Sequence, residues 1–206
     1  MWKWSLNWDQ ITPSIILGTC PMACEDLARI KAGTDVSAVL SLQHDNCLAY
    51  WKIDYPKIQR TGTELGLFME RCPIRDFDIA DMRKRLPDAI ASLHHILSAG
   101  HKAYVHCTAG LGRSPLVTLG YLTFIENFSP DDAIKLISAA RPGVVPSWEA
   151  YYGCHHDLVA RYRPAIEQRA YELYQRDIHG DAEADWRLAQ SEIIRAELTG
   201  RADSRS

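Results

Sequence analysis

A cysteine and an arginine separated by five residues, Cys107 and Arg113, are the side chains whose types and spacing point most directly to chemistry. A cysteine thiolate is a strong nucleophile, and the planar guanidinium of arginine matches two phosphate oxygens at once. Gly110 and Gly112 lie between them, and glycine has no Cβ to prevent a tight curl in which successive N–H groups point into one anion-binding concavity. The segment therefore predicts attack of a sulfur on a bound phosphate.

The elements on either side would position this segment. Lys102–Cys107 is short and β-prone, whereas Ser114–Asn127 has helical periodicity with Pro115 near its start. A helix N-terminus has unpaired N–H donors and a partial positive charge, so it stabilises both a phosphate and a thiolate. The phosphate-binding residues predicted from the loop are Thr108, Ala109, Gly110, Leu111, Gly112 and Arg113.

The sequence around the loop is similar to that of a known family. His106 and Cys107, with Arg113 and Ser114 after five intervening residues, resemble the His-Cys-x5-Arg-Ser/Thr signature of the cysteine-dependent dual-specificity phosphatases. Within that family, the loop looks like the variant carried by glucan phosphatases, which are the plant starch phosphatases and animal laforin. The resemblance runs from about Leu6 to Arg141 and includes Ile16-Leu17-Gly18-Thr19, Leu40-Ser41-Leu42-Gln43, Tyr50-Trp51-Lys52-Ile53-Asp54 and Arg75-Asp76-Phe77-Asp78.

The resemblance implies a reaction in two steps. Cys107 attacks phosphorus and forms a phosphocysteine, while Asp76 donates a proton to the leaving oxygen and later activates water. Ser114 hydrogen-bonds the sulfur as it departs. Asp76 lies 31 residues before the cysteine and matches the Asp-Phe pair of the family. Asp78 and Asp81 are the alternative acids, although helix capping or exposure to solvent explains both. Neither a metal nor a cofactor is expected.

The loop and the net charge both argue against a strongly anionic partner. Thr108 and Leu111 stand where a phosphoinositide-directed site would benefit from lysines. The chain has 23 lysine and arginine residues against 26 aspartate and glutamate residues, a net charge of −3. Neither nucleic acid nor a membrane is therefore expected as a partner. The run Arg83-Lys84-Arg85 is interpreted as a solvated helix face.

Aromatic side chains favour a sugar polymer as the substrate, because the C–H faces of sugar rings stack on aromatic rings. In the resembling glucan phosphatases, aromatic residues at the positions of Trp8, Trp51 and Phe77 line the approach to the cysteine. These three are therefore predicted to contact a phosphorylated glucan, resembling starch or glycogen. The alternative is a protein tyrosine, serine or threonine phosphatase of the same fold. A non-enzymatic phosphosugar-binding module is a third interpretation, which the retained acid, nucleophile and arginine oppose.

The order of elements predicts an α/β fold. Strand-like runs are Ser14–Thr19, Val36–Gln43, Leu67–Ile74 and Lys102–Cys107, and helical patterns are Glu25–Ala32, Pro56–Leu65, Arg83–Ala99, Ser114–Asn127, Ala133–Arg141, Ser147–Tyr162 and Ala165–Leu198, the last interrupted near His179-Gly180-Asp181. With the resemblance, this order implies the cysteine-phosphatase fold, a central mixed β-sheet flanked by helices on both faces.

The chain is expected to divide at about residue 163. Residues 1–163 would form the catalytic domain, and residues 164–206 a charged, amphipathic helical extension that either packs back onto the domain or forms an interaction arm. A cytoplasmic location is expected, because the sequence has no apolar run of membrane-spanning length and no signal pattern. The six cysteines are interpreted as reduced thiols.

Overall fold

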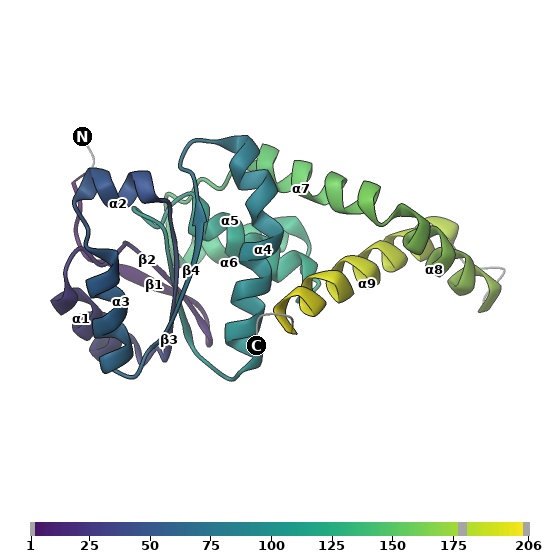
Figure 1. The fold of residues 1–206 in the computed structure, drawn as a ribbon. Helices are drawn as coiled ribbons and strands as arrows, with labels where there is room; N and C mark the ends of the chain where they lie inside the picture. Colours follow the sequence, from purple (N-terminus) through teal and green to yellow (C-terminus); the bar gives the residue numbers. More distant parts are fainter. Residues whose placement is uncertain (1–2, 177–180, 204–206) are drawn as a thin grey trace.

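A five-stranded mixed sheet lies at the centre of the computed structural model, which describes residues 3–176 and 181–203. The strands are β1 (Trp8–Thr12), β2 (Ile15–Gly18), β3 (Ala38–Gln43), β4 (Phe68–Ile74) and β5 (Ala103–His106). Their order across the sheet is β1-β2-β5-β3-β4 (Figure 1). β1 is antiparallel to β2, and the other neighbouring strands are parallel. β5 is central, so the segment that follows it leaves the middle of the sheet.

Helices cover both faces of this sheet, as the sequence predicts. They are α1 (Cys24–Thr34), α2 (Asp45–Trp51), α3 (Tyr55–Glu64), α4 (Ile79–Ser98), α5 (Arg113–Phe124), α6 (Pro130–Ala140), α7 (Trp148–Arg161), α8 (Arg163–Arg176) and α9 (Ala182–Asp203) within the described residues. α1, α2 and α3 pack on one face, and α4 to α7 together with α9 pack on the other (Figure 1).

Alternation along the strands creates two cores, because successive strand side chains point to opposite faces. The core under α4 and α5 takes Leu17, Leu40 and Val105, and the core under α1 and α3 takes Ile16, Val39 and Tyr104. Each of these side chains is buried. A strand such as β5 is therefore fixed from both faces, and this holds the start of the loop that follows it.

The four predicted strands agree with β2 to β5, but the sequence prediction misses β1 and α2. β1 lies at the edge of the sheet and buries only Ile11 among its residues, and α2 buries none, so neither has a clear hydrophobic period. α4 begins at Ile79 rather than Arg83, because Oδ1 of Asp78 accepts a hydrogen bond from the N–H of Asp81 and caps the helix there.

The C-terminal helices leave the body and return to it. α8 and α9 lie side by side and extend away from the sheet beyond α7, and the end of α9 packs on α4 (Figure 1). Ile194 and Leu198 of α9 belong to the core under α4 and α5, and Arg201 donates a hydrogen bond to Asp88 of α4. Of the two expected arrangements, α9 therefore has the packed one.

The predicted interruption at His179 and Gly180 lies outside the described residues. The division of the chain at residue 163 stays a prediction. In the part of the chain that the structure describes, no helix combines the length and the apolar character needed to cross a membrane.

Candidate active site

The loop Cys107–Gly112 joins the end of β5 to the start of α5, as predicted. Its curl depends on Gly110, whose φ is +71°, in the left-handed region that favours glycine. A Cβ at this position would lie 2.4 Å from the carbonyl oxygen of Gly18. β2 therefore packs so closely behind the loop that only glycine fits there.

Arg113 reaches from the first turn of α5 under the loop and is 1% exposed. Nη1 donates to the carbonyl oxygen of Ile74 at 2.9 Å and lies 3.4 Å from the sulfur of Cys47, and Nη2 donates to Oγ1 of Thr108 at 3.3 Å. Nε is buried and has no hydrogen-bond partner among the residues that the structure describes. A buried guanidinium with an unused donor can bind an anionic oxygen.

Cys107 is 3% exposed, and its environment favours the thiolate. Burial alone would raise the pKa of the thiol, but the Arg113 guanidinium, the hydroxyl and N–H of Ser114 and the N–H of Gly110 together hold that pKa below its usual value. Oγ of Ser114 lies 3.5 Å from the sulfur. The arrangement thus favours the thiolate form of Cys107 and places it next to donors that can bind phosphate oxygens.

His106 precedes the nucleophile on β5 and is buried. Its Nδ1 lies 2.9 Å from the carbonyl oxygen of Cys107, and since a carbonyl can only accept, Nδ1 donates. Burial lowers the pKa of His106 to about 4, although the hydrogen bond to Cys107 opposes this. The ring is therefore neutral near pH 7 and holds the first peptide of the loop.

Asp76 lies against the loop after β4, and its Oδ2 accepts a hydrogen bond from Nη2 of Arg113 at 2.7 Å. Asp78 and Asp81, the alternative acids, are engaged at the start of α4. Asp78 caps that helix, and Oδ2 of Asp81 accepts the N–H of Arg75 at 2.7 Å. Of the three carboxylates, only Asp76 forms an ion pair with Arg113.

A groove of about 960 Å³ opens above the loop. Trp51 and Phe77 line it, as do Thr108 and Leu111 of the loop. Phe77 has a φ of +57°, which is uncommon for a bulky residue, and it is 95% exposed. The structure therefore brings two of the three predicted glucan-contacting aromatic residues to the mouth of the loop.

Trp8 is not among the residues that line this groove, and its contact with a glucan stays a prediction. Its ring packs toward α1, where a Cβ on Gly33 would lie 2.5 Å from it, and it is partly buried against the core under α1 and α3. Alternation along β1 explains this, because Asp9 points to the opposite face and contacts Arg141.

The basic run also lies outside the groove. Arg83 forms an ion pair with Asp157 of α7, and Arg85 lies 3.9 Å from Asp81. The two arginines of the run therefore pair with carboxylates of the protein itself.

α2 contributes groove residues that the sequence prediction missed. His44, Asn46, Cys47 and Tyr50 come from this helix and its cap, and Val145 comes from the segment before α7. Arg71 of β4 positions α2, since its guanidinium donates to the carbonyl oxygen of Gln43 and to Oδ1 of Asp45. The adjacent aromatic residues Tyr50 and Trp51 are the sequence feature that could have indicated this part of the groove. No hydrophobic period marked them as part of a helix.

All six cysteines are free thiols. Among the described residues, no group of three or more histidine, cysteine, aspartate or glutamate side chains is placed to hold a metal ion.

Comparison with known proteins relates this site to other chains. Residues 24–151 match the family model of the dual specificity phosphatase catalytic domain. The chain is 31% identical over 163 residues to the amyloplastic phosphoglucan phosphatase DSP4 of Castanea sativa. The aligned residues cover 78% of this chain and 43% of that protein. It is 28% identical over 173 residues to laforin of Mus musculus, and the aligned residues cover 77% of this chain and 51% of laforin.

The chain thus spans about half the length, or less, of these two curated relatives. Among solved structures, the crystal structure of PTPMT1 superimposes with a TM-score of 0.59 at 20% identity, over 76% of this chain and 99% of that one. At this identity the likeness shows the fold.

Proposed function

The chain belongs to the dual specificity phosphatase family, and from this we propose that it removes phosphate from phosphorylated glucans through a phosphocysteine on Cys107. One observation carries the proposal. The thiol of Cys107 lines a groove of about 960 Å³ whose walls include Trp51, Phe77 and Tyr50, and the guanidinium of Arg113 is buried beside the loop. Such walls suit the faces of sugar rings, and the base suits one phosphate.

In the first step, the thiolate of Cys107 attacks phosphorus, and a sulfur–phosphorus bond forms as the bond to the sugar oxygen breaks. The donors that would bind the three equatorial oxygens are Arg113 and the N–H groups of the loop. Because these groups are fixed before substrate binds, their contribution is positioning and preorganised electrostatics.

Asp76 is the proposed acid for the leaving oxygen. In the structure its carboxylate accepts a hydrogen bond from Nη2 of Arg113, so a bound phosphate and Asp76 compete for the same donor. We expect the phosphate to displace the carboxylate toward the leaving group. Protonated Asp76 then supplies the proton that the departing alkoxide needs.

In the second step, water attacks the phosphocysteine. Asp76, now ionised, takes a proton from this water, and the sulfur leaves as a thiolate. The hydroxyl of Ser114, 3.5 Å from the sulfur, would stabilise that charge. The step returns the enzyme to its starting state and releases inorganic phosphate.

Two features favour a phosphorylated glucan over other phosphomonoesters as the proposed substrate. The groove carries aromatic side chains above the loop, and the side chains of the loop between the thiol and Arg113 are uncharged. The relative DSP4 supports this choice, because it is named a phosphoglucan phosphatase. Whether the polymer resembles starch or glycogen is left to the assay below.

The test is phosphate release from phosphorylated amylopectin and phosphorylated glycogen, compared with phosphotyrosine and phosphoserine peptides at equal phosphate concentration. The expected result is a higher kcat/KM for at least one polysaccharide. A strong preference for the peptides, together with no protein in the pellet when the polysaccharide is sedimented, would contradict the proposal. The substrate would then be a phosphoprotein.

The cytoplasmic location remains a proposal as well. The plant relative DSP4 is described as amyloplastic. Fractionation of cells expressing the full-length protein, with the catalytic variant Cys107→Ser as tracer, would assign the compartment.

A further inference from the structure

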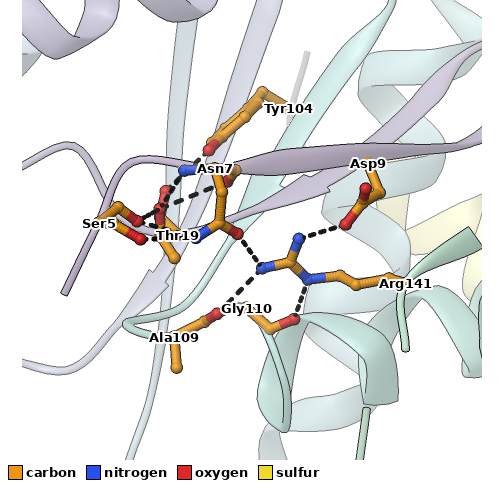
Figure 2. A network of polar contacts seen from close by, with 8 residues as sticks. All are labelled: Ser5, Asn7, Asp9, Thr19, Tyr104, Ala109, Gly110 and Arg141. Atoms are coloured by element: carbon orange, nitrogen blue, oxygen red, sulfur yellow. Dashed lines mark hydrogen bonds and ion pairs between the residues drawn. The ribbon is translucent and has the colours of Figure 1, made fainter. Parts of the chain in front are cut away.

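Arg141, at the end of α6, is 4% exposed and contacts the phosphate loop from behind. Its Nε donates to the carbonyl oxygen of Gly110 at 2.8 Å, and its Nη2 donates to that of Ala109 at 3.2 Å (Figure 2). Two consecutive carbonyls of the loop are therefore held by one guanidinium. From the sequence alone, Arg141 was expected only to end a helix.

The other side of the guanidinium is anchored to the N-terminal segment. Nη1 forms an ion pair with Oδ2 of Asp9 at 2.7 Å, and Nη2 also donates to Oδ1 of Asn7 at 2.8 Å (Figure 2). Together with the two loop carbonyls, these acceptors leave Arg141 little freedom to rotate. A planar guanidinium is suited to hold several acceptors at fixed angles, and an ammonium is not.

The anchor is itself held by the sheet. The N–H of Asn7 donates to Oγ1 of Thr19 at 3.1 Å, and the N–H of Thr19 donates back to the carbonyl oxygen of Asn7 at 3.0 Å. The hydroxyl of Tyr104 on β5 donates to the carbonyl oxygen of Thr19 at 2.8 Å (Figure 2). The contacts therefore form a closed chain from β5, through the N-terminal segment and Arg141, to the loop that follows β5.

The planarity of the peptide bond gives these contacts a consequence for the nucleophile. In a trans peptide the C=O and the N–H point in opposite directions. When Arg141 holds the carbonyls of Ala109 and Gly110 on the outer side of the loop, the N–H groups of Gly110 and Leu111 must point to the inner side. The N–H of Gly110 is among the groups that lower the pKa of Cys107, which agrees with this orientation.

We propose that Arg141 is a positioning residue, which aims the Gly110 and Leu111 N–H groups at the thiolate and phosphate, with Asn7 and Asp9 as its anchor. The guanidinium also polarises the two peptides that it binds and so strengthens their N–H donors. Asn7 and Asp9 lie before residue 24, where the match to the family model begins. The proposal rests on the phosphocysteine chemistry proposed above and not on the nature of the alcohol released.

The test compares Arg141→Lys with a matched variant, Arg201→Lys. Both substitutions keep the positive charge and remove a guanidinium that ties two elements together, but Arg201 joins α9 to Asp88 of α4 and lies outside the groove. Two properties are measured, namely the pH dependence of Cys107 alkylation by iodoacetamide, followed by mass spectrometry of the peptide, and kcat/KM for p-nitrophenyl phosphate. Melting temperatures are recorded for all variants.

Arg141→Lys is expected to raise the pH midpoint of alkylation and to lower kcat/KM about 10- to 100-fold, less than the roughly 10²–10³ lost when an oxyanion donor is removed outright. Arg201→Lys should change neither property, although its melting temperature falls. If Arg141→Lys lowers only the melting temperature, to the same extent as Arg201→Lys, the residue is structural and the proposal is overturned.

Asp9→Ala tests the same proposal in a variant where the loss of charge and the loss of the anchor would shift the pKa of Cys107 in opposite directions. It also provides a test if Arg141→Lys does not fold. Loss of a negative charge near the loop would by itself lower the pKa of the thiol. Loss of the anchor would instead let Arg141 move and would raise the alkylation midpoint. A downward shift with unchanged kcat/KM would show that only charge acts here and would overturn the proposal. Because alkylation needs no turnover, this readout stays informative even if glucans prove not to be substrates.

Discussion

The phosphate loop and the rim of the groove differ in how their side chains are held. In the loop, Cys107 and Arg113 are 3% and 1% exposed, and several partners from different elements fix each of them. On the rim, Tyr50 and Phe77 are 78% and 95% exposed. Phosphorus chemistry requires donors at fixed positions, whereas a polymer can be bound by rings that adjust. Changes in the loop should therefore affect every substrate, and changes on the rim only large ones.

The largest effect is expected from Cys107→Ser, because a serine hydroxyl is not ionised near neutral pH and cannot replace the thiolate. Phosphate release should vanish for p-nitrophenyl phosphate and for amylopectin alike, while sedimentation with the polysaccharide persists. This outcome would show that catalysis depends on the loop and that polysaccharide binding does not depend on the thiol. Turnover that survives the substitution would mean that another group attacks phosphorus.

Asp76→Ala should come next and should lower kcat by roughly 10²–10⁴-fold, the usual contribution of a positioned acid. The effect should be greater for an alkyl phosphate than for p-nitrophenyl phosphate, whose leaving group needs little protonation. Steady-state rates on both substrates provide the measurement.

Asp81→Asn is the matched control for this acid. Its amide oxygen can still accept the N–H of Arg75, so the loop geometry is kept while a carboxylate is removed. Rates close to those of the parent protein are expected. A loss as large as that of Asp76→Ala would assign the proton to Asp81 instead.

Protonation of His106 at acid pH should destabilise the folded protein, because the buried ring is neutral in the folded state. Burial lowers the pKa of His106 to about 4, against about 6.5 in the unfolded chain. Between these values the unfolded state binds more protons, so the free energy of unfolding falls as pH drops from about 6.5 to about 4, by roughly 3 kcal/mol at most.

The measurement is urea unfolding at pH 7 and at pH 4.5. His106→Asn keeps a donor for the carbonyl oxygen of Cys107 but cannot titrate, so its stability should depend less on pH. Equal pH dependence in the two proteins would assign the acid sensitivity to other groups.

The smallest effect is expected on the rim. Trp51→Ala should lower kcat/KM for phosphorylated amylopectin about 2- to 10-fold, in line with the 0.5–1.5 kcal/mol of an aromatic contact, and should leave p-nitrophenyl phosphate hydrolysis nearly unchanged. Trp8→Phe is the comparison, since that ring packs on α1 and not in the groove. Equal losses on the two substrates in Trp51→Ala would show that the rim supports the loop itself.

Local signals explain which parts of the site could be predicted. The thiol, the arginine and the glycines lie within one short segment between a strand and a helix, so their spacing alone indicated a phosphate-binding loop. Residues on separate elements gave weaker signals. Trp51 and Phe77 reach the groove and Trp8 does not, because the pairing of β1 decides which face each of its side chains occupies.

The amino-acid sequence by itself determined the strand–loop–helix segment that carries the proposed nucleophile, four of the five described strands and the α/β architecture, since these depend on short-range spacing and periodicity. Only the tertiary structure decided which distant groups meet the loop. Arg141 lies 132 residues from Asp9 along the chain, yet the two form an ion pair behind the loop. No local pattern encodes such a contact, because it arises only when the sheet and α6 pack together.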